Sequence, residues 1–249
     1  MTDTKETALR MKATNVPTPN RYWEQLANEV LNFSPEEQRA AVTLYRELAK
    51  GQAVDADQLA RALSVPPAEA RALLARNSIK AFVYPDKQGR VLGFGGLAAA
   101  QMDHRFEVDG RTLWTWCAWD TLFIPEILGK SARIDSRDPE NREVVRLTVS
   151  PDRVESVEPE GAVVSFVLPD GHFQTSATNV MANFCHFVFF FTSRTSGERW
   201  TAKHPGTFLY SLDDAFALAK RLNAKNFGPE LARRASAAAA KSGGSCCAQ

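Results

Sequence analysis

The segment LWTWCAWDTLFIPEILG holds a cysteine and an aspartate three residues apart, Cys117 and Asp120. On a helix or in a tight turn, that spacing places the thiol and the carboxyl group on one face. The neighbouring Trp114, Trp116 and Trp119 lower the local dielectric, and burial of this kind raises the pKa of a carboxyl group. We therefore expect Asp120 to hold a proton at neutral pH beside a nucleophilic thiol. Taken alone, the spacing is more typical of a buried, inert cysteine and an aspartate that caps a helix.

A second apolar setting surrounds Cys185, in the run NFCHFVFFF, which we predict to be a buried strand from Phe184 to Thr192. A lone cysteine on such a strand is structural by default. His186 would point to the opposite face of that strand. His204, in AKHPG, is predicted to be a loop residue rather than a ligand.

Three kinds of site compete for these residues. A zinc site needs four cysteine or histidine ligands at close spacing, often Cys-x-x-Cys, and the sequence has no such pair. A cysteine hydrolase would use Cys117 as nucleophile with His186 or His204 as base, although nothing in the sequence marks either histidine as its partner. A soft-metal site would use two distant thiols and one carboxylate, because two thiolates suit a large soft cation.

The composition is that of an ordinary globular protein, with 249 residues of which 44% are hydrophobic and 24% charged. This length allows one or two domains. The net charge of +1 lacks the basic surplus of a dedicated nucleic-acid binder. The stretch MTDTKETALRMK lacks the apolar run of a signal peptide, and no segment reaches the ~18 apolar residues that span a membrane. We therefore expect a cytoplasmic protein without a membrane partner.

Four cysteines are present, and in a reducing cytosol they are expected to be free thiols: Cys117, Cys185, Cys246 and Cys247. The sequence alone still permits a disulfide between Cys117 and Cys185.

The first part of the chain is predicted to be helical. After a polar arm at residues 1–20, apolar residues recur at helical spacing from Tyr22. The sequence Ser34-Pro35-Glu36-Glu37 is typical of a capping box with proline at the first helical position. Further helices are expected at Gln58–Leu63 and from Pro66.

A hairpin of strands at Ile79–Tyr84 and Val91–Phe94 is predicted to follow these helices. Helices followed by a hairpin give residues 21–98 the order of a winged-helix-like domain. DNA binding is the obvious interpretation of that order, but fold does not imply function. The second helix of the pair carries only Arg71 and Arg76 against Glu69, so we favour a docking or lid role.

Residues 99–228 are predicted to form a mixed or antiparallel β-sheet domain with flanking helices, which makes the fold class α+β. The expected strands are His104–Val108, Ala132–Asp135, Val144–Val149, Val163–Leu168 and Phe184–Thr192. Helices are expected at Thr121–Leu128, ended by Gly129, and from Ser211 to Gly228. Residues 229–249 are predicted to be a flexible tail.

An ordered set of segments between residues 25 and 225 resembles the organomercurial lyases, also called alkylmercury lyases. The set is LWTWCAWDTLFIPEILGKSARI, VVRLTVSP, VESVEPEGAVVSFVLP, FCHFVFFF and AKHPG. The functional residues of that family are a cysteine, an aspartate three positions later and a second cysteine downstream, which fall on Cys117, Asp120 and Cys185. Some members carry a further cysteine where this chain has His186, to which we assign no ligand role.

The resemblance implies an enzyme that cleaves the carbon–mercury bond of alkyl- and arylmercury by protonation, giving a hydrocarbon and mercury(II). It implies that Cys117 and Cys185 bind mercury, that Asp120 moves the proton, and that no organic cofactor is needed. The alternative is a mercury-responsive winged-helix regulator, which would bind DNA and sense mercury through the same two cysteines.

The pair Cys246 and Cys247, in the ending SGGSCCAQ, lies outside the segments that resemble the family. It is either an unstructured end without a role or a relay that passes mercury(II) from Cys117 and Cys185 to mercuric reductase. This ending resembles that of mercuric reductases, which also carry a cysteine pair near the C-terminus. Small thiols are the other expected partners.

Overall fold

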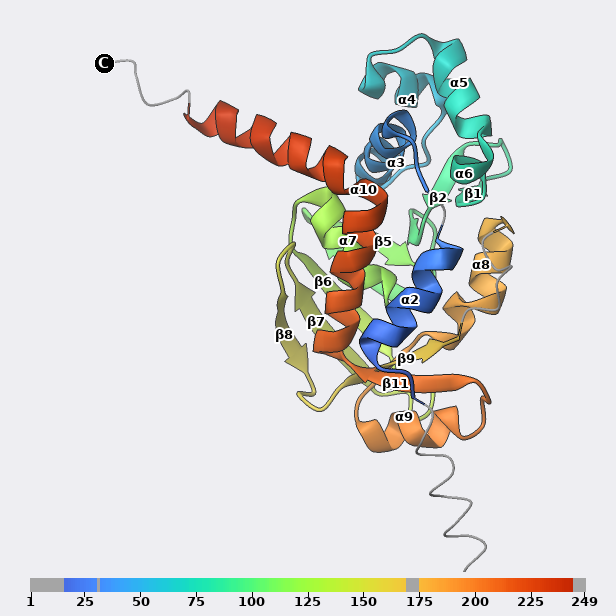
Figure 1. Ribbon diagram of the computed structural model, residues 1–249, viewed down its shortest axis with the longest axis vertical. Coiled ribbons are helices and arrows are strands. Elements are labelled where there is room, and N and C mark those ends of the chain that lie inside the picture. Colours follow the sequence, from blue (N-terminus) through green and yellow to red (C-terminus); the bar gives the residue numbers. More distant parts are fainter. Residues whose placement is uncertain (1–15, 31, 169–174, 244–249) are drawn as a thin grey trace, which may run out of the picture.

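The computed structural model describes residues 16–30, 32–168 and 175–243 (Figure 1). The predicted arm at residues 1–20 falls largely outside this part, and so does the pair Cys246 and Cys247. The described helices are α2 (Pro19–Glu29), α3 (Pro35–Leu48), α4 (Ala56–Leu63), α5 (Pro67–Ala75), α6 (Asn77–Lys80), α7 (Asp120–Leu128), α8 (Ala177–Asn183), the 3-10 helix η2 (Cys185–Phe187), α9 (Arg194–Thr201) and α10 (Leu212–Gly243).

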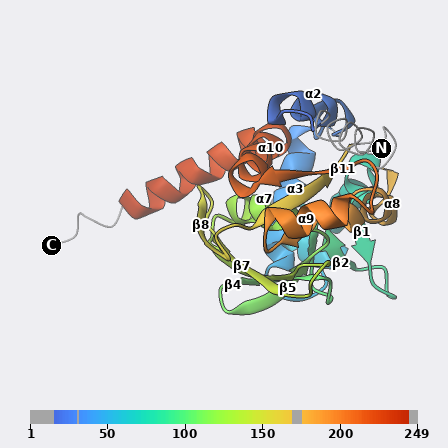
Figure 2. The same cartoon turned by 90° about the horizontal axis from the view of Figure 1, so that it is seen from below.

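Two antiparallel sheets accompany these helices, which confirms the α+β fold class. The larger has eight strands in the order β1-β2-β3-β5-β4-β6-β7-β8, and the smaller has the order β10-β9-β11. The strands are β1 (Val83–Pro85), β2 (Val91–Phe94), β3 (Leu97–Ala98), β4 (His104–Val108), β5 (Arg111–Thr115), β6 (Ala132–Arg137), β7 (Val144–Val149), β8 (Val154–Glu158), β9 (Val163–Val167), β10 (Phe190–Phe191) and β11 (Thr207–Ser211). The large sheet forms one side of the molecule, opposite α2 and α10 (Figure 2).

Local sequence explains where several helices begin and end. Ser34 forms the predicted capping box, since its hydroxyl accepts from Glu37 N at 3.3 Å and the Glu37 carboxylate accepts from Ser34 N at 2.7 Å. Asp55 and Gln58 make a second capping box at the start of α4. Gly129 ends α7 in the left-handed region, at φ 68°, where glycine has no steric penalty.

Helices α3 to α6 occupy one end of the molecule, and the hairpin that follows them joins the large sheet (Figure 1). Strand β2 pairs with β3, and β3 pairs with β5, so the predicted boundary at residue 98 falls within a continuous sheet. The winged-helix assignment and the division into domains stay predictions. The strand predicted from Ile79 is wrong in its first half, because Ile79 and Lys80 lie in α6 and the strand begins only at Val83.

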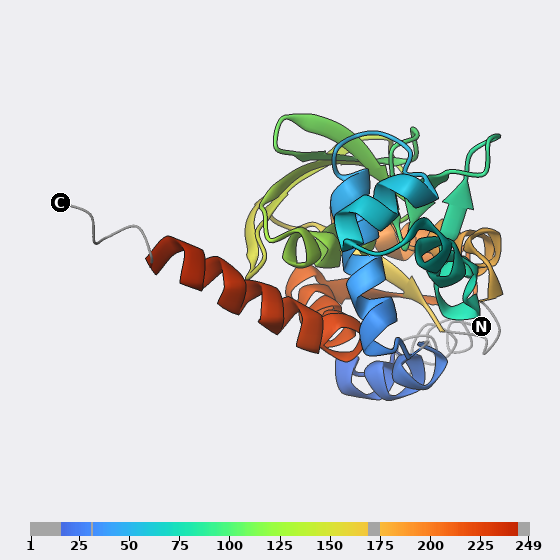
Figure 3. The same ribbon diagram turned by 90° about the horizontal axis from the view of Figure 1, so that it is seen from above.

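The predicted end of the last helix at Gly228 is wrong, because α10 continues through Pro229 to Gly243. Side chains beyond Pro229 tie the helix to itself and to α3. Glu230 accepts from Arg233 and Arg234, and Arg234 also donates to Thr43 Oγ1 at 3.0 Å. The last part of α10 then extends away from the rest of the molecule (Figure 3).

The buried apolar residues form one main core that extends from α2 to α10, with Cys117 and Cys185 inside it. A small second cluster joins Val163, Phe191, Trp200 and Leu209. Within the described part of the chain, no helix is long and apolar enough to cross a membrane.

Candidate active site

Cys117 and Asp120 lie in the tight turn between β5 and α7. Asp120 is the first residue of α7, and its Oδ2 accepts from the backbone N–H of Cys117 at 2.7 Å. Thr115 Oγ1 donates to Cys117 O at 2.9 Å, and Thr121 Oγ1 donates to Ala118 O at 2.7 Å. These bonds fix the turn on both sides, so the three-residue spacing holds thiol and carboxyl group together as predicted.

Cys185 comes from a different kind of element than the sequence predicts. The expected strand from Phe184 to Thr192 is wrong, because Cys185 begins the 3-10 helix η2 and only Phe190–Phe191 pairs with β9. The Ser165 side chain takes the place of regular pairing here: its hydroxyl donates to Phe187 O at 2.7 Å and accepts from Phe189 N at 3.0 Å. A side chain that satisfies backbone groups in this way competes with the ladder of a sheet.

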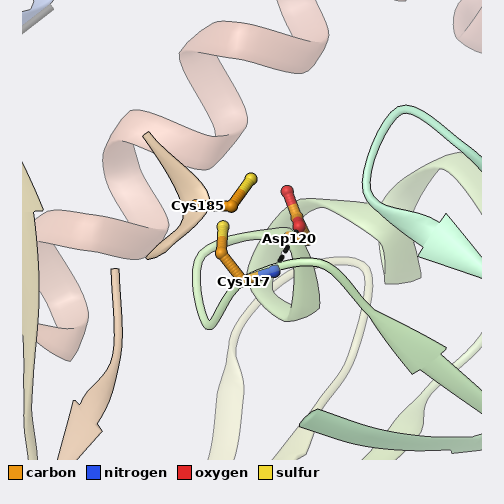
Figure 4. Close-up of side chains that lie close together, drawn as sticks. All are labelled: Cys117, Asp120 and Cys185. Atoms are coloured by element: carbon orange, nitrogen blue, oxygen red, sulfur yellow. Dashed lines mark hydrogen bonds between the residues drawn. The ribbon is translucent and has the colours of Figure 1, made fainter. Parts of the chain in front are cut away.

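One backbone bond joins the two segments, since Ala118 N donates to Val188 O at 3.1 Å. As a result, the ligand atoms of Cys117, Asp120 and Cys185 lie within 4.8 Å of one another (Figure 4). Their exposed fractions are 0%, 6% and 2%. Both cysteines are free thiols. Two sulfurs and one carboxylate form a donor set that suits a soft cation.

Burial controls the protonation of this group. It raises the pKa of Asp120 from 3.8 to about 7, against the opposing effect of the hydrogen bond from Cys117 N. Burial also raises the pKa of Cys117 well above its usual range, and the adjoining Cys185 thiol raises it further. The pKa of Cys185 is raised chiefly by burial, while the hydrogen bond from Cys117 lowers it in part. At neutral pH the thiols are thus protonated, and the carboxyl group titrates.

Gly96 positions the Asp120 side chain and was not found by the sequence argument. Its φ is +99°, and a Cβ at this position would lie 2.4 Å from Asp120 Cγ. Neighbouring Gly95 is held from the other side, because Tyr45 OH of α3 donates to Gly95 O at 2.7 Å. The Gly-Gly pair before β3 is the signal in the sequence that marks such a close approach. The aspartate is therefore packed between its own helix and a turn that α3 supports.

A cavity of about 90 Å³ opens beside Asp120 and Cys185. A dry apolar cavity of roughly 150 Å³ binds benzene, so a space of this size suits a small organic group. Its wall is mostly apolar and comes from helices and strands of both halves of the chain: Leu26, Val30, Phe33, Tyr45, Phe82, Phe94, Gly95, Gly96, Trp116, Trp119, Phe123, Val180, Phe184, Leu222, Asn226 and Phe227.

Three tryptophans were predicted to surround the thiol and the carboxyl group. Trp116 and Trp119 line this cavity, while Trp114 lines a separate hollow with Arg105 and Asp135. Trp119 is fixed by a hydrogen bond from its Nε1 to Ala215 O at 3.0 Å. The expectation that all three surround the thiol and the carboxyl group is therefore wrong for Trp114.

The histidines in the described part of the chain, His104, His186 and His204, lie apart from this group. His186 is exposed, and His204 stacks on Trp200 with its Nδ1 2.7 Å from Trp200 O. His104 is buried, with Nδ1 2.7 Å from Ser136 Oγ. Among the described residues, the group around Cys117 contains no histidine. In the part of the chain that the structure describes, the site therefore has neither the base of a cysteine hydrolase nor the four ligands of a structural zinc site.

The α+β fold buries two free thiols and one carboxyl group beside an apolar cavity. A protein with such a site is suited to bind a soft metal that carries an apolar group. Comparison with known proteins identifies the family. The family model MerB, alkylmercury lyase, matches residues 97–224. The chain belongs to the alkylmercury lyase family.

Curated relatives agree with this assignment. The chain is 40% identical over 182 residues to an alkylmercury lyase of Staphylococcus epidermidis, covering 73% of this chain and 80% of the relative. It is 35% identical over 199 residues to an alkylmercury lyase of Pseudomonas putida, covering 79% and 90%. The solved structure of the mercury-bound form of MerB2 has a TM-score of 0.65 and 20% identity, covering 82% of this chain and 96% of that one, which shows a shared fold.

Proposed function

We propose that this protein is an organomercurial lyase in which Cys117 and Cys185 bind mercury and Asp120 carries the proton that releases the hydrocarbon. The observation that carries this proposal is the buried group of two thiols and one carboxyl oxygen within 4.8 Å. Family membership supports the reaction, and the geometry supports the roles of the three residues. The regulator alternative gains no support, since the relatives above are lyases.

The reaction begins with thiol exchange. One cysteine thiol attacks mercury of R–Hg–SR′, its proton goes to the leaving thiolate, and R′SH departs. The second thiol then binds mercury and gives its proton to the Asp120 carboxylate. The added thiolate pushes electron density toward carbon, Asp120 returns the proton to that carbon, and the carbon–mercury bond breaks. The products are R–H and mercury(II) on two thiolates, with Asp120 ionised again.

The protonation of the site fits these steps. Thiols with a raised pKa bring their protons into the reaction, and a carboxyl group with a pKa of about 7 both accepts and donates a proton at neutral pH. The cavity beside them would hold the organic group R and exclude water from it. The two thiols and the carboxyl group supply every group these steps need, so we propose that no organic cofactor takes part.

Turnover of phenylmercury tests the proposed function. Pure protein with excess small thiol should release benzene in many equivalents per site, because small thiols displace mercury(II) from Cys117 and Cys185. Gas chromatography measures the benzene. Binding of one equivalent without benzene would refute the lyase and favour a mercury sensor.

The rate of cleavage is expected to rise with pH below about 7 and to level off above it, because the Asp120 carboxylate must be ionised to take a proton from a thiol. The measurement is single-turnover benzene release from the phenylmercury–thiol complex between pH 5 and 9. The Asp120→Asn variant should lack this dependence. A wild-type rate that falls as pH rises through 7 would show that the protonated carboxyl group is the form that starts the reaction.

Mercuric reductase is the proposed acceptor of mercury(II), and Cys246 and Cys247 are proposed to pass it on. An adjacent pair of thiols acts at high effective concentration toward a bound metal. The pair is proposed to collect mercury(II) from Cys117 and Cys185, because an incoming thiolate can displace bound mercury stepwise.

Without added small thiols, deletion of residues 245–249 should slow mercury(II) transfer from the loaded enzyme to mercuric reductase, with normal benzene release. An unchanged transfer rate would leave the pair without a relay role.

We also propose a cytoplasmic location, because both thiols must be reduced to bind mercury and the cytosol keeps thiols reduced.

A further inference from the structure

One wall of the cavity carries an amide without a partner. Asn226 of α10 lines the cavity and is 8% exposed, and its Oδ1 has no hydrogen-bond partner among the described residues. Its neighbours along the wall, Leu222 and Phe227, are apolar. Burying an amide oxygen without a partner destabilises a fold, whereas leucine would fill the same space at no such cost. The asparagine is therefore unexplained by stability.

The helix holds this amide in place. One turn earlier, Asn223 Nδ2 donates to Phe123 O at 2.8 Å and to Glu126 Oε2 at 2.7 Å. Phe227 stacks on Phe33 with ring centroids 5.6 Å apart and an interplanar angle of 23°. With its neighbours anchored on both sides, Asn226 stays on the cavity wall.

Trp116, another residue of the wall, also carries a polar atom without a partner in the described part of the chain. Trp116 Nε1 is buried and has no partner among the described residues, whereas Tyr45 OH already donates to Gly95 O. An indole N–H only donates, while an amide both accepts and donates. Away from Asp120 the cavity thus offers neutral hydrogen-bonding groups, in a setting that disfavours a buried charge.

We propose that Asn226 selects organomercurials whose organic group carries a neutral hydroxyl, an inference that rests on the proposed lyase function. A hydroxyl is the smallest group that both donates, here to Asn226 Oδ1, and accepts, here from the amide N–H of the same side chain. The rest of the organic group meets an apolar wall. Asn226 is then a residue of substrate specificity that touches the organic group and not the reacting bond.

The test compares phenylmercury with its three hydroxyphenylmercury isomers, in the wild type and in Asn226→Leu. We compare the ratio of kcat/KM for hydroxyphenylmercury to kcat/KM for phenylmercury in each protein. For at least one isomer, this ratio should be about five- to tenfold higher in the wild type than in Asn226→Leu, which is the effect of losing one neutral hydrogen bond. Comparing the two proteins cancels the intrinsic reactivity of each substrate. Leu218→Met, a volume-conserving change on the same helix outside the cavity wall, should leave the ratio as in the wild type.

A second measurement needs no variant: the wild type should prefer that isomer over the corresponding methoxyphenylmercury, which cannot donate, by about the same factor. Melting temperatures check that the variants are folded, and Asn226→Ala provides a second substitution. If the ratio for every isomer is the same within twofold in the wild type and in Asn226→Leu, while the wild type still releases benzene, the proposed selectivity is wrong and the lyase function stands. Absence of benzene from the wild type would instead refute the lyase function itself.

Discussion

Replacing Asp120 with asparagine is expected to slow carbon–mercury cleavage by about 10²–10⁴-fold, the usual contribution of a general acid–base group. The amide keeps the shape of the side chain, and its oxygen can still accept from Cys117 N. It cannot take a proton from a thiol or give one to carbon. Both thiols remain, so the variant should still bind phenylmercury.

The same substitution is expected to stabilise the fold at alkaline pH. A carboxyl group whose pKa rises from 3.8 to about 7 on folding is bound more tightly to its proton in the folded state. Its contribution is therefore neutral below pH 4, becomes unfavourable as pH rises from 4 to 7, and reaches roughly 4 kcal/mol above 7. Asparagine has no such pH-dependent penalty.

Single-turnover benzene release and urea unfolding at pH 5 and pH 8 measure both effects. The gain in the free energy of unfolding should be largest at pH 8. Asp103→Asn, on an exposed aspartate, provides the matched control and should change neither quantity appreciably. Cleavage within twofold of the wild type would assign the proton to another group, and a loss of stability at pH 8 would contradict the raised pKa.

Cys117→Ser and Cys185→Ser are each expected to lower turnover by at least about 10³-fold, the scale of losses when an enzyme is deprived of its nucleophile. A serine hydroxyl is a hard ligand and binds mercury poorly. Each variant keeps one thiol, so each should still capture one equivalent of phenylmercury without releasing benzene. Mass spectrometry of the intact adduct measures the capture.

Cys246→Ala combined with Cys247→Ala is the control for these variants, because it removes the other two cysteines of the chain and keeps Cys117 and Cys185. Its benzene release should stay close to that of the wild type. Near-normal turnover in either folded serine variant would mean that one thiol suffices and would rule out the two-thiol mechanism.

Local sequence predicts the half of the site that is local. Cys117 and Asp120 meet because three residues of a turn join them, and hydrogen bonds of that turn complete the arrangement. The capping sequence at Ser34 and the glycine at Gly129 likewise fix helix ends through groups only a few residues apart.

The secondary structure of the segment that carries Cys185 could not be predicted from the local sequence. The run around it is as apolar as a buried strand, yet the hydroxyl of Ser165, 22 residues away from Phe187, satisfies its backbone and leaves η2 in place. The structure places the cysteine named by the resemblance beside Cys117 and Asp120, but the secondary structure predicted around it was wrong. Likewise, the Gly228-Pro229 sequence predicts a helix end, which contacts between α10 and α3 override.

Gly96 and Asn226 went unnoticed because their roles depend on contacts across the fold. Gly96 matters through its distance to Asp120, and Asn226 through the wall it shares with aromatic residues from the other end of the chain. The Gly95-Gly96 pair marks a close approach but does not identify Asp120 as its partner, and no spacing in the sequence points to Asn226.

Cleavage of one equivalent of phenylmercury without small thiols tests the central claim most directly. The account predicts one benzene per protein and one mercury retained. After denaturation at low pH, peptide mapping should show that Cys117 and Cys185 no longer react with an alkylating reagent, whereas the other two cysteines do. Benzene released with mercury on other cysteines, or with either of these two thiols still free, would contradict it.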